Sequence, residues 1–194
     1  MGHREDLLEG AKRCLMEKGF VRTTARDIVK ESGTNLASIG YHYGSKDALM
    51  AQAFVELVQE WGEKFDPADR RDTEDGGSVE RFRDVWARML ETLDESRPVW
   101  AASLEVATQG ERLAELRKLM AAAQIEGRSG LVAMFTGRDE ATLDEHTVRT
   151  LGGFYQALLN GLMVQWLFDP ASASTADDLT AGLRQVIEAA APEK

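Results

Sequence analysis

The chain is poor in the residues that build disulfides and metal centres. Its only cysteine, Cys14, excludes an internal disulfide and a cysteine-based metal site. The histidines are His3, His42 and His146, and no two of them stand at metal-ligand spacing. No glycine-rich phosphate loop or nucleophile motif is present either. The sequence therefore predicts a protein without a metal, a cofactor or an enzymatic activity.

Long apolar runs are also missing. The most apolar stretch is residues 151–168. It carries Gln156, Asn160 and Gln165, whose polar groups favour a buried helix over a membrane span. The N-terminus has no apolar run after a basic start, so we expect no signal peptide and a cytoplasmic protein that does not bind a membrane.

Positive charge is scarce overall, but its distribution is uneven. The net charge is −10, which opposes binding to a polyanion unless basic residues gather on one face. Residues 1–50 carry a net charge of +1 and the rest of the chain −11. Within residues 18–46 the net charge reaches +3. Any contact with DNA is therefore expected in the first 50 residues.

Helical periodicity runs through almost the whole chain, and alternating runs of Val, Ile and Thr are absent, so the predicted fold is all-α. A first helix is expected at about residues 4–18, ended by Gly19. Thr24 and Asp27 then form a capping box for a short second helix, which Gly33 ends. Later helices are expected at about 78–95, 98–109, 111–135, 144–168 and 176–190, after a charged loop at 65–77.

A third short helix, LASIGYHY, opens at Asn35, and Ser45 caps a fourth at about 46–64. Two short helices joined by a Gly-containing turn and braced by longer helices are the architecture of a helix-turn-helix DNA reader. The leading end of the second short helix would reach base edges, and polar residues around it would bind phosphates. The candidate contacts are Thr24, Arg26, Asn35, Leu36, Ala37, Ser38, Tyr41, His42 and Lys46. The alternative is an all-α protein-interaction module in which this corner only packs.

The run TTARDIVKESGTNLASIGYHYGSKDALM resembles the helix-turn-helix signature of the TetR-type family of bacterial transcriptional regulators, over about residues 5–54. The matching positions are Gly19-Phe20, Thr23-Thr24, Ile28-Val29, Gly33, Ile39, Tyr41-His42-Tyr43 and Ser45-Lys46-Asp47-Ala48-Leu49. The resemblance implies an all-helical homodimer with a DNA-binding domain at 1–50 and a connecting fourth helix. It implies a ligand-binding and dimerisation domain at 51–194, and a repressor that leaves a palindromic operator when a small, mostly apolar effector binds.

The resemblance also implies roles for single residues. Carried over by position, the phosphate contacts fall on Thr24, Tyr41, His42 and Lys46, and the base-reading positions on Arg26, Asn35, Leu36, Ala37 and Ser38. The family often has an aromatic residue where this chain has Gly40, so one contact is absent and the recognition helix is expected to be more mobile. Leu36 cannot donate a hydrogen bond and would read at most a thymine methyl group.

Aromatic, methionine and amide side chains at helical spacing in the C-terminal part are candidates for an effector pocket, although each is also consistent with plain core. They are Phe82, Trp86, Met89, Trp100, Met120, Gln124, Phe154 and Tyr155, with Gln156 and Asn160 as further polar groups. Small residues that recur every four positions, together with an apolar stripe on the last helix, indicate a dimer interface. These are Gly153, Ala157, Gly161, Leu179, Leu183, Val186 and Ile187. The alternative is that both faces pack internally.

Overall fold

The computed structural model describes residues 2–63, 78–108 and 114–190, so the loop expected at 65–77 lies outside the described residues. Every regular element in the described ranges is a helix, which confirms the predicted all-α fold. The described residues fall into two compact units. The first unit takes those of Met1–Lys64 and Glu95–Ala123, and the second those of Phe65–Asp94 and Gln124–Lys194.

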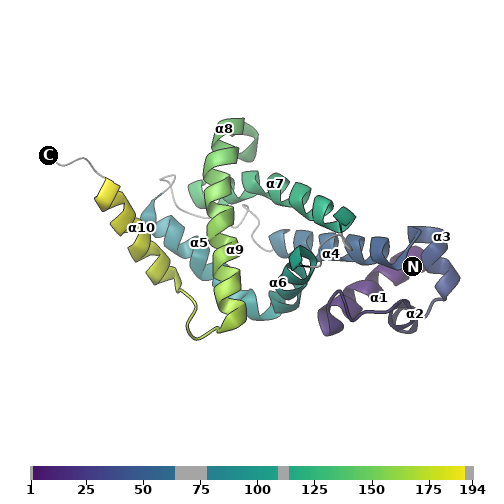
Figure 1. Cartoon of the computed structure of the whole chain (residues 1–194). Helices are drawn as coiled ribbons and strands as arrows, with labels where there is room; N and C mark the ends of the chain where they lie inside the picture. Colours follow the sequence, from purple (N-terminus) through teal and green to yellow (C-terminus); the bar gives the residue numbers. More distant parts are fainter. Residues whose placement is uncertain (1, 64–77, 109–113, 191–194) are drawn as a thin grey trace. The chain divides into compact units, whose positions relative to one another are not determined.

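The first unit begins with four helices: α1 (His3–Lys18), α2 (Ala25–Ser32), α3 (Leu36–Tyr43) and α4 (Lys46–Glu63), labelled in Figure 1. Helix α1 packs against α2, α3 and α4, and α3 packs against α2 and α4. Their apolar stripes meet in one core, which contains Leu7, Leu15, Ile28, Ile39, Leu49 and Phe54. Because burial of an amphipathic face supplies most of the stability of short helices, α2 and α3 depend on this core.

Helix α6 (Leu93–Thr108) adds Val99, Ala102 and Val106 to the same core, and the start of α7 (Ala114–Thr136) adds Leu116. The expectation that α6 begins at Pro98 is wrong, because the helix begins at Leu93. A proline in the second turn costs one backbone hydrogen bond. Burial of Leu93 and Val99, which are 1% and 6% exposed, offsets that loss.

The second unit contains α5 (Val79–Glu91), the later part of α7, α9 (Gly153–Phe168) and α10 (Ala176–Ala190). Between α7 and α9 lie three short helical turns, η3 (Glu140–Thr142), α8 (Glu145–Thr147) and η4 (Val148–Gly152). The core of this unit is aromatic, and its four clustered rings are Phe82, Trp86, Phe135 and Tyr155.

The helix expected at 144–168 is interrupted by a π-helical turn, η4 (Val148–Gly152), immediately before α9. There, α7 and α9 approach closely, since a Cβ atom on Gly152 would lie 2.8 Å from Cβ of Arg128. The Arg128 Nε donates to Oε1 of Gln156 at 2.8 Å, and Nε2 of Gln156 donates to the Gln124 carbonyl at 2.9 Å. These contacts depend on which helices pack together, and hydrophobic periodicity along one helix does not predict that.

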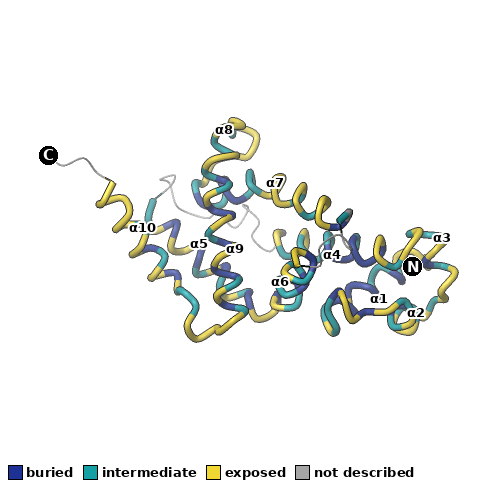
Figure 2. The backbone as a smooth tube through the Cα atoms, in the orientation of Figure 1, coloured by how far each residue is buried: buried dark blue, intermediate teal, exposed yellow. Residues whose placement is uncertain are grey.

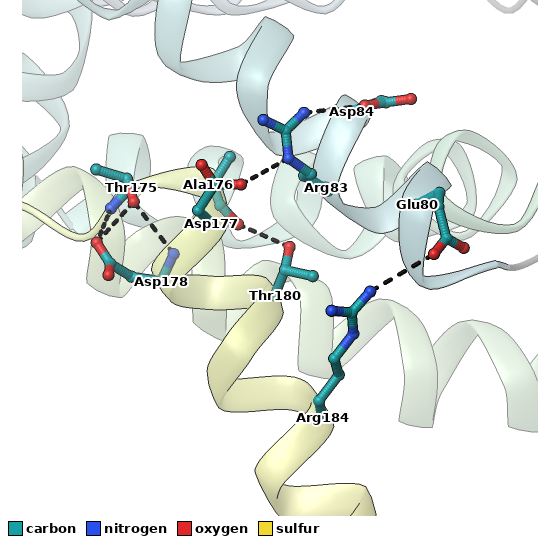
Figure 3. Close-up of polar contacts among 9 residues, drawn as sticks. All are labelled: Glu80, Arg83, Asp84, Thr175, Ala176, Asp177, Asp178, Thr180 and Arg184. Atoms are coloured by element: carbon teal, nitrogen blue, oxygen red, sulfur yellow. Dashed lines mark hydrogen bonds and ion pairs between the residues drawn. The ribbon is translucent and has the colours of Figure 1, made fainter.

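Helix α10 lies along α5, and exposed ion pairs and hydrogen bonds mark that contact (Figure 3). Arg83 Nε lies 2.6 Å from Asp177 Oδ1, and Arg184 Nη2 lies 3.5 Å from Glu80 Oε1. Exposed pairs of this kind each contribute roughly 0–1 kcal/mol. They therefore set the register of α10 on α5 more than they stabilise it.

Among the described helices none is long and apolar enough to cross a membrane.

Candidate nucleic-acid interface

The corner between α2 and α3 is built by two caps. Gly33 ends α2 in the left-handed conformation, with φ of 67°, which glycine adopts without strain. Asn35 begins α3, and its Oδ1 accepts a hydrogen bond from the backbone N–H of Ser38 at 3.1 Å. The hydroxyl groups of Ser32 and Thr34, which lie 2.8 Å apart, connect the two caps. The corner therefore holds the two short helices at a defined angle.

The leading end of α3 faces outward. Asn35, Leu36 and Ala37 are exposed, with Leu36 at 52%, whereas Ile39 on the opposite side is 4% exposed and lies in the core. Figure 2 shows this alternation along α2 and α3, where exposed segments cover the outer side of both helices. Arg26 on α2 is also exposed, and Ser38 is half-buried. The expected base-reading residues are thus exposed except for Ser38, and Ile39 anchors α3 in the core.

The far end of α3 carries an aromatic pair. Tyr41 is 85% exposed, and its ring meets that of His42 edge-on at 4.8 Å between centroids. Tyr43 points inward instead, and its hydroxyl donates to the Arg4 carbonyl at 2.7 Å, which ties α3 to α1. A Cβ atom on Gly40 would meet nothing within 4 Å, so the space beside this residue is open.

Thr24 caps α2, and both its hydroxyl and its backbone N–H form hydrogen bonds with another residue of the protein. Its hydroxyl donates to Asp27 Oδ2 at 2.7 Å, and its backbone N–H donates to the same oxygen at 2.9 Å. The Lys18 ammonium lies 2.6 Å from Asp27 Oδ1. The hydrogen bonds from Lys18 and Thr24 hold the pKa of the Asp27 carboxyl well below its usual range. A phosphate bound by the Thr24 hydroxyl would have to replace Asp27 as its partner.

Lys46 lies beside the start of α2, at the same end of the unit as Thr24. Its Nζ donates to the Thr23 carbonyl at 3.2 Å, lies 3.0 Å from Asp47 Oδ1 and stands 5.7 Å from the centre of the Phe20 ring. The structure therefore brings two expected phosphate contacts together. It also holds the Lys46 ammonium, which is half-buried, in contacts that a phosphate would partly replace.

The sequence analysis did not identify Glu105, which supports the turn before α2. The carboxylate of Glu105, on α6, accepts hydrogen bonds from the backbone N–H groups of Phe20 and Val21 at 3.0 and 3.1 Å. A Cβ atom on Gly19 would lie 3.1 Å from the same carboxylate. Glu105 thereby fixes the turn that leads into α2. These partners lie 84 and 85 residues apart in the sequence, so no local pattern signals the contact.

The candidate pocket residues are divided between the two units. Phe82, Trp86, Met89 and Tyr155 are buried in the second unit, where Phe135, which the sequence analysis missed, stacks on Tyr155 at 4.2 Å. Phe154 is 45% exposed and Gln124 is exposed. Trp100 and Met120 belong to the first unit, where the Trp100 ring meets Trp61 edge-on at 5.0 Å and Met120 packs on the helix-turn-helix core. Asn160 is exposed, and Gln156 joins α9 to α7.

The candidate interface residues lie on α9 and α10 and are largely accessible. Val186 and Ile187 are 65% and 55% exposed, Ala157 and Gly161 are exposed, and Gly153, Leu179 and Leu183 are half-buried. A Cβ atom on Gly161 would meet nothing within 4 Å. The two buried members of the α10 face, Ala176 and Thr180, lie at its N-terminal end. The apolar stripe of α10 therefore continues past its internal contacts.

A buried core holds the two short helices α2 and α3 and leaves the start of α3 exposed to solvent. This arrangement defines a helix-turn-helix DNA-binding domain. The model of the tetR family of bacterial regulatory proteins matches residues 7–53. The transcriptional repressor AcnR of Corynebacterium efficiens is 35% identical over 57 residues, which are 29% of this chain and 28% of AcnR. The likeness to the tetR family therefore covers the N-terminal helix-turn-helix domain, and the matched residues span less than a third of AcnR.

Solved structures extend the likeness in fold to the C-terminal part. SCO7518 of Streptomyces coelicolor A3(2), named as a candidate transcriptional regulator, is 21% identical with a TM-score of 0.69, over 95% of this chain and 97% of that one. The multidrug binding protein EbrR, complexed with proflavin, is 24% identical with a TM-score of 0.58, over 95% and 99%. At these identities the likeness shows the fold alone. It agrees with an N-terminal helix-turn-helix domain followed by a helical domain.

Proposed function

We propose that this protein is a ligand-responsive repressor that binds a palindromic operator as a homodimer. The observation that carries the proposal is the exposed leading end of α3, where Asn35, Leu36 and Ala37 are accessible and Ile39 anchors the helix in the core. A recognition helix needs this combination, because base edges are read by accessible side chains whose position the core holds. The repressor role is supported by the likeness of residues in this domain to AcnR.

The phosphate contacts proposed for this domain flank the reading surface. Tyr41 and His42 lie at the far end of α3, and Lys46 lies beside Thr24 at the start of α2. Such contacts fix the register of the protein on the duplex without reading its sequence. Basic residues are sparse elsewhere relative to acidic ones, since the chain beyond residue 50 carries a net charge of −11. Repulsion from that part would therefore favour an approach to DNA by the helix-turn-helix domain.

The proposed dimer is supported by the outer faces of α9 and α10. Val186 and Ile187 expose apolar side chains, whereas Ala176 and Thr180 at the N-terminal end of α10 are buried, and Gly161 leaves room for a neighbouring helix. A twofold axis brings the same surface of two subunits together, so a self-complementary apolar face is what a homodimer requires. Two reading heads would then face half-sites separated by roughly 34–36 Å.

The proposed effector site lies in the aromatic core of the second unit. Phe82, Trp86, Phe135 and Tyr155 come from α5, α7 and α9, and an apolar, aromatic lining suits an apolar effector. EbrR, which shares this fold, was solved as a complex with proflavin.

Selection of bound fragments from a random duplex DNA pool, at near-physiological salt, tests the proposal. The expected result is one enriched palindrome whose half-sites are centred about one helical turn apart. The double variant Leu36→Ala with Ala37→Asp, which places a negative charge on the exposed reading surface, serves as the matched control and is expected to enrich nothing. A folded, ligand-free protein that enriches no sequence would contradict the proposal and favour an all-α protein-interaction module.

A further inference from the structure

We infer that the effector is a planar aromatic compound with a hydrogen-bond acceptor, and that Trp86 orients it by donating a hydrogen bond from Nε1. The inference rests on the proposed effector site in the second unit. It goes further, because it assigns a chemical class to the ligand and a directed contact to one atom.

The first observation is an unused donor in the core. The Trp86 side chain is 0% exposed, and its indole N–H is the one buried side-chain polar group for which the described structure gives no hydrogen-bond partner. A buried N–H that has left water without gaining an acceptor destabilises the folded protein. Because nearly all buried polar groups are paired in native proteins, this exception calls for an acceptor that arrives from outside the chain.

The second observation is the chemistry around this donor. The Phe82 ring lies 6.1 Å from the Trp86 ring, and Phe135 lies 5.2 Å from it. Neither neighbour has an acceptor, and a trapped water molecule would need two or more polar partners. Ring faces instead favour offset stacking with another flat ring. A flat aromatic ligand that carries its own carbonyl or ether oxygen satisfies both the rings and the N–H.

Tyr155 gives the cluster a second polar end. Its ring stacks on Phe135 at 4.2 Å and lies 6.4 Å from Phe82. Its hydroxyl is a neutral donor at physiological pH, and burial raises its pKa further above that range. Met89 and Met163, which are 0% and 2% exposed, are also buried in this unit. Flexible methionines can repack, which allows the rings to separate for a ligand.

The test uses two flat tricyclic probes that differ by one acceptor: 9-fluorenone, which has a carbonyl oxygen, and fluorene, which has none. The full chain is labelled with ¹⁵N at its four tryptophans, and the indole N–H resonances are recorded by NMR with and without each probe. Trp86→Phe assigns the Trp86 resonance and removes the donor while keeping an aromatic ring. Trp100→Phe is the matched control, because Trp100 Nε1 already donates to the Ser96 hydroxyl at 3.2 Å.

The expected result is a downfield shift of the Trp86 proton with 9-fluorenone but not with fluorene. Trp86→Phe should weaken 9-fluorenone binding about tenfold and leave fluorene binding within about twofold, and Trp100→Phe should change neither. Binding of 9-fluorenone with an unmoved Trp86 resonance would overturn the directed contact, as would equal loss of both probes in Trp86→Phe. Failure of both probes to bind would overturn the ligand class. These measurements need no DNA, so they succeed or fail separately from the operator selection.

Discussion

At the scale of single residues, Asn35 combines two tasks that use different atoms. Its Oδ1 accepts the Ser38 N–H and caps α3, while its amide nitrogen remains to donate to a base edge, as asparagine does to adenine. A variant can therefore separate the two tasks. Serine at this position keeps a capping oxygen and removes the long amide, whereas alanine removes both.

We expect Asn35→Ser to keep the stability of the protein within about 0.5 kcal/mol, and Asn35→Ala to lower it by about 1 kcal/mol. Both variants should lose roughly 1–3 kcal/mol of affinity for the selected operator and much less for random DNA. Urea unfolding measures the first quantity, and fluorescence anisotropy with the two duplexes measures the second. An equal loss on both duplexes would make Asn35 a residue that positions the protein and reads no base.

Asp27 makes the first unit sensitive to acid. Because contacts with Lys18 and Thr24 hold its pKa low in the folded state, folding favours the ionised carboxylate. Its stabilising contribution is therefore complete above the unfolded-state pKa of about 3.9 and is lost as the pH falls further. The difference in urea midpoint between wild type and Asp27→Asn should be largest near neutral pH and shrink below about pH 4. Glu17→Gln, at an exposed carboxylate of α1, is the control, and a difference constant from pH 7 to 3 would contradict the argument.

At the scale of helices, the close approach of α7 and α9 depends on a glycine. A Cβ atom on Gly152 would lie 2.8 Å from Cβ and 2.9 Å from the carbonyl oxygen of Arg128, and neither atom can swing away as a side-chain tip would. The neighbouring Gly127, on α7, has open space around the same position. The two glycines therefore differ in packing while both lie in helical segments of the second unit.

Gly152→Ala is expected to destabilise the protein by roughly 1–3 kcal/mol, because the helices must separate or the π-helical turn must rearrange. Gly127→Ala is expected to stabilise it by up to about 1 kcal/mol through the higher helix propensity of alanine. Urea unfolding of both variants at one protein concentration gives the comparison. Stabilisation by Gly152→Ala would show that the helices do not approach this closely.

Local signals in the sequence predicted many of the helix boundaries. The caps at Thr24, Asn35 and Ser45 all accept the backbone N–H three residues later, as a capping residue should. Gly33 ends α2 where its left-handed conformation is needed. These boundaries follow from hydrogen bonds within one turn of helix, so residue types at short spacing were sufficient to find them.

Contacts between distant segments could not be predicted in this way. Glu105 binds the turn before α2, Phe135 joins the aromatic cluster, and α6 begins at Leu93, five residues before the expected start at 98. Each depends on which helices meet and on what they bury, and hydrophobic spacing gives only the face of a helix. The same limit applies to Trp86, whose helical spacing fits both a pocket and the core and gives no sign of an indole N–H without a partner.

At the scale of the whole molecule, the proposed repressor depends on joining two weak readers. A single helix-turn-helix head makes few contacts, and linking two heads on one palindrome raises affinity by roughly 10²–10⁴-fold without any new contact. The linkage would come from α9 and α10, where α10 is buried at Ala176 and Thr180 and its apolar stripe is accessible at Val186 and Ile187. The apolar side chains of α10 extend beyond the part of the helix that packs within the same chain. A second copy of the chain would cover these exposed side chains.

Val186→Asp tests this linkage directly. A charge at the centre of a self-complementary apolar face meets its own copy across the axis, so the variant should be monomeric in analytical ultracentrifugation where the wild type is dimeric. Affinity for the palindrome should fall by roughly 10²–10⁴-fold, and affinity for a single half-site should stay nearly unchanged. Gln185→Asp introduces the same charge on the exposed opposite side of α10 and should remain dimeric. A Val186→Asp protein that stays dimeric would move the interface away from α10, and equal losses on the palindrome and the half-site would mean that the heads do not act as a pair.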